Sequence, residues 1–144
     1  METYFSRSSQ ETFEIGRSLG KQLIAPCVIC FFGELAAGKT TFIKGLVEGA
    51  TNLSPSIVQS PTFTYLNIYD GKNKIFHFDL YRLRDIDEFL SMGFDEYFDA
   101  DGICCIEWSE RISDFLPDDY IKICLTHAFE DERYITLQRV TKEV

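Results

Sequence analysis

The sequence predicts an α/β fold in which helices cover both faces of a mixed, mostly parallel sheet. Two observations lead to this prediction. The apolar run 28–32 leads through a glycine-containing segment into the helix-forming residues 41–47, the order of a buried strand and its crossover helix. Asp70-Gly71 separates two runs rich in β-branched and aromatic residues, 62–69 and 75–78, which indicates an antiparallel hairpin within the sheet.

Two further segments have helical patterns. Residues 9–23 place apolar side chains among charged ones at the spacing of an amphipathic helix, and Ser8 or Ser9 can cap its start. Residues 85–98 also have a helical pattern, interrupted at Gly93.

Three more apolar runs complete the predicted sheet, at 103–107, 120–125 and 134–140. An acidic turn at 130–132 separates the last two strands. Residues 51–61 are polar and contain two prolines, so we expect a loop there. No linker or repeat divides the chain, so we expect a single domain over residues 1–144.

Composition excludes several classes of function. The chain has 144 residues, 45% of them hydrophobic, which is enough for one domain with its own core. The net charge of −9 argues against tight, independent binding of nucleic acid, which needs clustered Lys and Arg. No apolar run approaches a membrane span, and the polar segment 1–8 lacks a signal-peptide pattern. We therefore expect a soluble, cytoplasmic protein.

The five cysteines are interpreted as buried, reduced, structural residues. Cys27 and Cys30 form a C-x-x-C pattern, but residues three apart on a strand point to opposite faces of the sheet. Cys104 and Cys105 are adjacent on another predicted strand and fail to converge for the same reason, and Cys124 stands alone.

Residues 33–40 read Gly-Glu-Leu-Ala-Ala-Gly-Lys-Thr, a full match to G-x-x-x-x-G-K-[ST] between a strand and a helix. Gly33 and Gly38 allow a tight turn that points backbone N–H groups at phosphate oxygens. Lys39 adds a positive charge for the β- and γ-phosphates, and the Thr40 hydroxyl can bind Mg²⁺ at a helix N-terminus. The sequence therefore predicts a phosphate-binding loop and a P-loop NTPase-like three-layer sandwich.

Acidic residues at strand ends are the candidates for metal binding and for control of the attacking water. Glu107 follows the apolar residues 103–106, on a strand expected to neighbour the loop strand, and can reach Mg²⁺ directly or through water. Asp79 closes the second hairpin strand and is the candidate for positioning or activating water. The alternatives are an acid at a strand exit for Glu107 and a turn or helix-capping aspartate for Asp79.

Three other residues near these acids have open roles. Thr62 lies after the predicted loop, where nucleotide switches often place a hydroxyl that senses the γ-phosphate. Trp108 follows Glu107 and either shapes the site or packs as an ordinary aromatic residue. His77 lies in phase with Asp79 among phenylalanines, and we interpret it as a packing residue without a chemical role.

Four motifs, in this order, resemble those of the TsaE (YjeE) family: Gly33-Glu34-Leu35-x-Ala37-Gly38-Lys39-Thr40-Thr41, Ser60-Pro61-Thr62-Phe63-Thr64, His77-x-Asp79-Leu80-Tyr81-Arg82-Leu83 and Glu107-Trp108-Ser109-Glu110. The resemblance extends from Glu11-Thr12 to Arg133. These are bacterial ATPases needed to form threonylcarbamoyladenosine at position 37 of tRNAs reading codons that begin with A. Ala36 departs from the pattern, because the family usually has glycine there, and a forced positive φ would cost alanine about 1–2 kcal/mol.

The resemblance implies a compact P-loop fold, slow Mg²⁺-dependent ATP hydrolysis, and association with the partners TsaB and TsaD, which make the tRNA contacts. By the same resemblance, Lys39 and the amides of the loop that runs through Thr41 hold phosphates, and Thr40 and Glu107 hold Mg²⁺. Asp79 acts near the γ-phosphate, and Thr12 and Arg133 lie near the adenine.

Three alternatives remain beside the ATPase. A small-molecule kinase usually needs an arginine-rich lid, whereas the arginines here are dispersed. A GTPase finds partial support in Asp99-Ala100-Asp101-Gly102 and Asn73-Lys74, but these stand in the wrong order and lack the guanine-reading aspartate. A scaffold that binds nucleotide without hydrolysing it is the third.

Overall fold

The computed structural model describes residues 1–32 and 38–142 of the chain. The strands within these ranges are β1 (Glu2–Ser6), β2 (Cys27–Phe32), β3 (Leu66–Asp70), β4 (Lys74–Asp79), β5 (Ile103–Glu107), β6 (Asp119–His127) and β7 (Arg133–Thr141). The α-helices are α1 (Ser9–Gln22), α2 (Lys39–Thr51) and α3 (Ile86–Ser91), and the 3₁₀ segments are η1 (Pro55–Ile57), η2 (Phe94–Asp99) and η3 (Ser109–Phe115).

All of these strands belong to one mixed sheet with the order β1-β7-β6-β2-β5-β4-β3. The central strands β6, β2, β5 and β4 are mutually parallel. At one side β3 pairs antiparallel with β4, which confirms the predicted hairpin. At the other side β7 returns antiparallel to β6, and β1 pairs antiparallel with β7.

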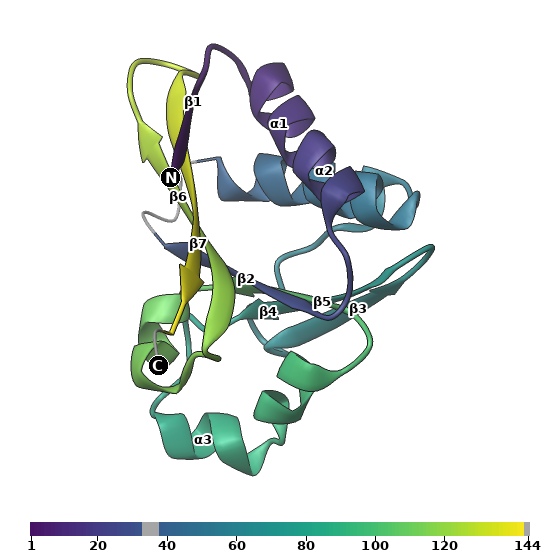
Figure 1. Cartoon of the computed structure of the whole chain (residues 1–144), viewed down its shortest axis with the longest axis vertical. Coiled ribbons are helices and arrows are strands. Elements are labelled where there is room, and N and C mark those ends of the chain that lie inside the picture. The colour runs from purple at the N-terminus through teal and green to yellow at the C-terminus, as the bar shows by residue number, and fades with distance from the viewer. Residues whose placement is uncertain (33–37, 143–144) are drawn as a thin grey trace.

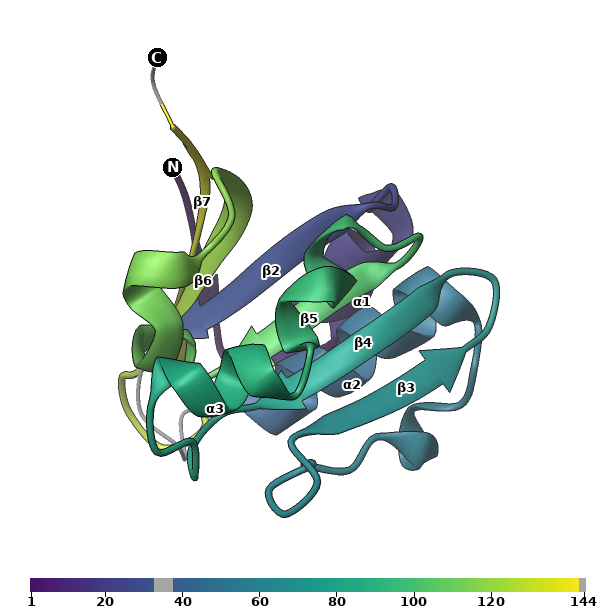
Figure 2. The same ribbon diagram turned by 90° about the horizontal axis from the view of Figure 1, so that it is seen from below.

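Helices cover both faces of the sheet, as predicted (Figure 1). Helices α1 and α2 lie on one face, whereas α3 and the neighbouring short helical segments lie on the other, as the view from below also shows (Figure 2). Successive side chains on a strand point to opposite faces of the sheet and pack into two separate cores. On β2, Ile29 and Phe31 join the core under α2, while Val28 and Cys30 join the core on the α3 side.

The cysteines of the C-x-x-C pattern are separated by the same alternation. Cys27 packs against the α2-side core and Cys30 belongs to the α3-side core, so the two thiols face opposite sides of the sheet. Cys104 and Cys105 divide between the two cores in the same way, and all five cysteines are free thiols.

Helices α1 and α2 approach each other backbone to backbone at glycines. A Cβ on Gly16 would lie 2.3 Å from the carbonyl oxygen of Phe42, and a Cβ on Gly45 would lie 2.1 Å from that of Phe13. Both distances are too short for any side chain. Helix α1 begins as predicted, because the Ser8 side chain caps it by accepting from the backbone N–H of Glu11.

Several boundaries differ from the sequence-based expectation. The strand expected over 62–69 begins only at Leu66, because Tyr65 adopts a positive φ of 67° and its N–H bonds to the carbonyl of Pro61, which closes a turn. Helix α2 runs on through Thr51, and the expected loop contains η1. The interruption at Gly93 is confirmed, with φ 73° between α3 and η2. Strand β1 was not expected at all.

No helix in the described ranges has the length and apolar character that crossing a bilayer requires.

Candidate functional site

The predicted glycine loop joins β2 to α2, which confirms its strand–loop–helix setting. Its residues Gly33, Glu34, Leu35, Ala36 and Ala37 lie outside the described residues, as does the strain expected at Ala36. Gly38 is described: it is the N-cap of α2 and adopts φ 87°, a conformation that favours glycine.

The N-terminus of α2 has no side-chain cap, since Gly38 has no side chain to offer. The helix is 13 residues long, and Thr40 is exposed in its first turn while Thr41 is partly buried. Uncapped N–H groups and the helix dipole together favour an anion at this end.

Lys39 begins α2 and is 1% exposed. Its Nζ has no hydrogen-bond partner among the described residues and lies 5.0 Å from the centre of the Trp108 ring. A buried ammonium group without an anion is costly, and an adjacent aromatic ring compensates only part of that cost. The Lys39 site therefore suits an anionic ligand such as a phosphate.

Asp79 and Glu107 end neighbouring parallel strands in direct register. Glu107 also lies opposite Phe31 of β2, one residue before the strand ends. Both acids are buried, at 3% and 6% exposure, and both lie at the edge of the sheet where β2 enters the glycine loop. The predicted neighbouring positions of Glu107 and the loop strand are confirmed.

Asp79 is held by hydrogen bonds from three directions. Its Oδ2 accepts from the Ser60 hydroxyl at 2.7 Å and lies 3.5 Å from the Thr62 hydroxyl. Its Oδ1 accepts from the backbone N–H of Tyr81 at 3.0 Å. The structure therefore brings the predicted residues Asp79 and Thr62 together, and adds Ser60 to them.

Glu107 has a partner that sequence reasoning missed. His77 Nε2 lies 2.8 Å from Glu107 Oε2, and His77 Nδ1 lies 3.0 Å from the hydroxyl of Tyr69. The interpretation of His77 as a packing residue was incomplete, because both of its ring nitrogens are bonded and one of them reaches an acid of the site. The in-phase spacing of His77 and Asp79 indicates only that both side chains face the same side of the sheet, because the partner of His77 depends on the register of β4 against β5.

Trp108, which directly follows Glu107, contacts the buried Lys39 and also two exposed residues, Tyr81 and Arg111. It has a positive φ of 60°, and its ring lies 5.0 Å from that of Tyr81 and 6.0 Å from the Arg111 guanidinium. Together with its contact to Lys39, this packing favours the interpretation in which Trp108 shapes the site.

The residues expected near the adenine gather beside Gly38. Thr12, Gly38, Thr41 and Arg133 line one small depression, together with Ser9 and Asp131. Thr12 is buried and bonded to the Ser6 hydroxyl, and Arg133 donates from one guanidinium nitrogen to the carbonyls of Glu130 and Glu132. These side chains come from α1, α2 and β7, so the depression depends on the tertiary fold.

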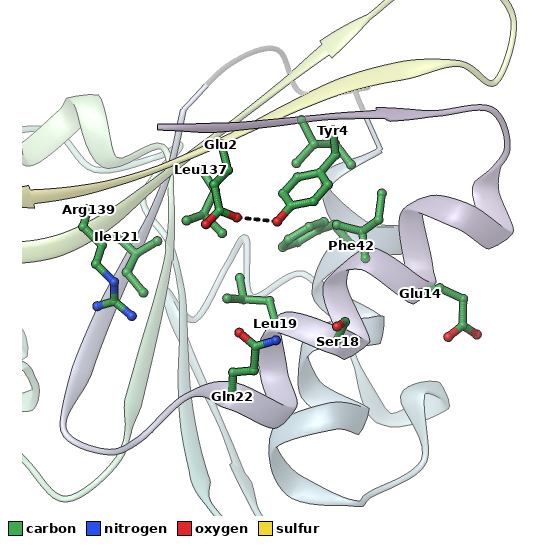
Figure 3. Close-up of a pocket in the computed structure, with 12 residues that line it drawn as sticks. Glu2, Tyr4, Glu14, Ser18, Leu19, Gln22, Phe42, Ile121, Leu137 and Arg139 are labelled. Atoms are coloured by element: carbon green, nitrogen blue, oxygen red, sulfur yellow. Dashed lines mark hydrogen bonds between the residues drawn. The ribbon is translucent and has the colours of Figure 1, made fainter.

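A larger cavity of about 310 Å³ lies elsewhere, between α1 and the β1–β7–β6 side of the sheet. Its wall includes Leu19 and Phe42, and at its rim Tyr4 donates a hydrogen bond to Glu2 (Figure 3). Lys39, Asp79 and Glu107 are not among its lining residues. Its size alone does not make it the functional site.

A parallel core with an uncapped glycine turn at the start of α2 and two acids on the adjacent strands is the α/β architecture of P-loop NTPase-like proteins. The crystal structure of Bacillus subtilis YdiB superimposes with a TM-score of 0.77 at 31% identity, covering 97% of this chain and 85% of that one. A family model described as threonylcarbamoyl adenosine biosynthesis protein TsaE matches residues 6–135. The chain belongs to the TsaE family.

Relatives of the same description support this membership. The tRNA threonylcarbamoyladenosine biosynthesis protein TsaE of Treponema pallidum is 39% identical over 132 residues, which cover 92% of this chain and 96% of the relative. The protein of that name from Bacillus subtilis is 43% identical over 114 residues, covering 78% of this chain and 70% of the relative.

Proposed function

We propose that the protein is a Mg²⁺-dependent ATPase required to form threonylcarbamoyladenosine at position 37 of tRNAs that read codons starting with A. It acts by binding and hydrolysing ATP on a partner complex of TsaB and TsaD. Membership of the TsaE family supports this proposal, since the relatives in two bacteria carry names from that pathway.

One observation carries the biochemical part of the proposal. A buried lysine at the start of α2 has no hydrogen-bond partner among the described residues and lies at the same sheet edge as the in-register acids Asp79 and Glu107. Phosphoryl transfer needs a cation for the phosphates and acids to manage the metal and the water, and this arrangement supplies both.

The residues divide by role. Lys39 and the loop amides hold the phosphates, while Thr40 and Glu107 hold Mg²⁺, which keeps few protein ligands when phosphates complete its shell. Asp79 orients the attacking water, and the Thr62 hydroxyl that lies beside it senses the γ-phosphate. Bound Mg²⁺ supplies charge neutralisation for the phosphates.

The positions of two residues support a site for the rest of the nucleotide, and the net charge of the chain indicates how tRNA is bound by the complex. Thr12 and Arg133 are assigned to the adenine end of the nucleotide, and their common position in the depression beside Gly38 supports this assignment. The net charge of −9 suits a cytoplasmic subunit that leaves tRNA to its partners.

The test is ATP turnover measured for the protein alone, with TsaB and TsaD, and with both partners plus tRNA. We expect slow turnover alone, stimulation by the partners, and loss of both in Lys39→Ala. Turnover that stays absent under every condition, despite nucleotide binding, would instead support the non-hydrolysing scaffold. Unchanged turnover in Lys39→Ala would contradict the assignment of the loop.

A further inference from the structure

A chain of hydrogen bonds crosses three neighbouring strands and ends on Glu107. The backbone N–H of Gln59 donates to the Tyr69 hydroxyl at 3.3 Å. That hydroxyl, on β3, lies 3.0 Å from Nδ1 of His77 on β4, and His77 Nε2 lies 2.8 Å from Glu107 Oε2 on β5. The imidazole thus connects a phenol on one side to a carboxylate on the other.

The chemistry of the end group sets the direction of this chain. A carboxylate only accepts, so His77 Nε2 carries the proton of the bond to Glu107. In a neutral imidazole with its proton on Nε2, Nδ1 can only accept, so the Tyr69 hydroxyl is the donor of the bond to Nδ1. The same hydroxyl also lies 3.2 Å from the Gln59 carbonyl, which accepts from the Asn67 amide at 3.0 Å. Burial raises the pKa of Tyr69, so the hydroxyl keeps its proton. Each member therefore donates toward Glu107.

Burial makes this arrangement rigid. His77 is 1% exposed and packs in the sheet next to the Tyr69 ring, at 5.8 Å between ring centres. Bonds at both nitrogens fix the rotation of the imidazole and its tautomer. The bond from His77 in turn holds the carboxylate of Glu107 through Oε2, and no hydrogen bond from the described residues occupies Oε1.

The same short segment reaches both acids of the site. Gln59 begins the chain to Glu107, and the next residue, Ser60, donates directly to Asp79. The orientation of the two carboxylates is therefore tied to one stretch of backbone.

We propose that His77, itself held by Tyr69, is a positioning residue that orients Glu107 for Mg²⁺. This inference rests on the proposed function, in which Glu107 is a metal ligand. A histidine behind a metal-binding carboxylate restricts the conformations of that side chain, so that less freedom is lost when the metal binds. Loss of such an outer partner typically lowers metal affinity by about 10–100-fold.

The test compares the dissociation constant of ATP with Mg²⁺ to that with EDTA, by calorimetry on the whole chain. In His77→Leu, which removes the donor, we expect the gain in affinity due to Mg²⁺ to fall by about 10–100-fold, with metal-free binding unchanged. Tyr69→Phe should reduce the gain in the same direction but less. His77→Gln, which keeps an N–H donor, should recover part of it.

Phe78→Leu is the matched control, because Phe78 is equally buried on the same strand but faces the opposite core. It should lower stability and leave the Mg²⁺-dependent gain unchanged. If His77→Leu does not fold, as judged by circular dichroism, Tyr69→Phe decides the question.

The outcomes separate the two proposals. If Glu107→Ala loses the gain while His77→Leu and Tyr69→Phe keep it in full, the positioning role is wrong and the metal assignment stands. If the parent protein shows no gain from Mg²⁺, or Glu107→Ala keeps it, both proposals are overturned.

Discussion

The ammonium group of Lys39 lies 5.0 Å from the centre of the Trp108 ring. Trp108 is the only tryptophan of the chain, so tryptophan fluorescence comes from this site alone. In the proposed function a phosphate competes with the ring for the ammonium group, and a direct charge pair is stronger than a cation–π contact of about 0.5–2 kcal/mol.

We therefore expect Trp108 emission to rise when Mg²⁺ and ATP are added, because an ammonium group close to an indole can quench it by transferring a proton to the excited ring. Adenosine, which lacks phosphates, should leave the emission unchanged. The Lys39→Ala variant should show no response to ATP. An equal response to adenosine and to ATP would show that the signal does not come from the phosphates.

Asp79→Asn should separate hydrolysis from binding. The amide keeps the size of the side chain and an acceptor for Ser60, but it loses the charge that orients water. We expect turnover to fall by about 10²–10⁴-fold with little change in ATP affinity. Steady-state turnover and calorimetry measure the two effects, and Asp87→Asn on the exposed side of α3 is the control. Normal turnover in Asp79→Asn would leave Asp79 only the role of a turn residue.

Gly45→Ala should destabilise the protein although alanine is the better helix former. Intrinsic propensity favours alanine by about 1 kcal/mol. However, the new Cβ would lie 2.1 Å from the carbonyl oxygen of Phe13, so α1 and α2 must move apart. We expect a net loss of about 1–3 kcal/mol in the free energy of unfolding, measured with urea.

Ser18→Ala is the control for this prediction, since Ser18 is exposed on α1 and should gain a few tenths of a kcal/mol (about 0.5) from propensity alone. Equal stability of Gly45→Ala and the parent protein would mean that the helices can separate at little cost.

The buried thiols should resist alkylation, and their raised pKa values should make the folded protein less stable at alkaline pH. Burial raises the pKa of Cys30 and of Cys104 from the usual 9.0 to about 12. Between these values the unfolded chain releases protons that the folded chain retains, so the free energy of unfolding falls as the pH rises from about 9 toward about 12.

Urea titrations at neutral and alkaline pH test this sign, and Cys104→Ala should lose less stability between the two conditions than the parent. Mass spectrometry after iodoacetamide treatment should find the partly buried Cys27 and Cys124 modified before the other three. Modification of Cys104 at the rate of Cys27 would contradict the expected protection.

Elements defined by local patterns could be predicted from the sequence. The apolar run before the glycine loop and the Asp-Gly hairpin are patterns of consecutive residues. From them the existence of β2, α2, β3 and β4 could be predicted. Strand β1 could not be found in this way, because its Glu2–Ser6 is short, polar and mostly exposed. Its only reason to be extended is pairing with β7, which lies far along the chain.

The candidate site also contains residues that the sequence predicts and contacts that it does not. Asp79 and Glu107 could be predicted because each ends an apolar run, and parallel strands end at a common edge. The bond between His77 and Glu107 could not, because it depends on the register of β4 against β5. The link from Tyr69 requires the register of β3 as well.

The pairing of β1 with β7 constrains how the molecule is made. Glu2–Ser6 leaves the ribosome well before the strand that holds it, because Arg133–Thr141 is synthesised more than a hundred residues later. Likewise β2 pairs with β6, so the middle of the sheet cannot be completed until β6 has been synthesised. Such long-range closure is slow, and we expect the sheet to be completed only after translation has passed β7.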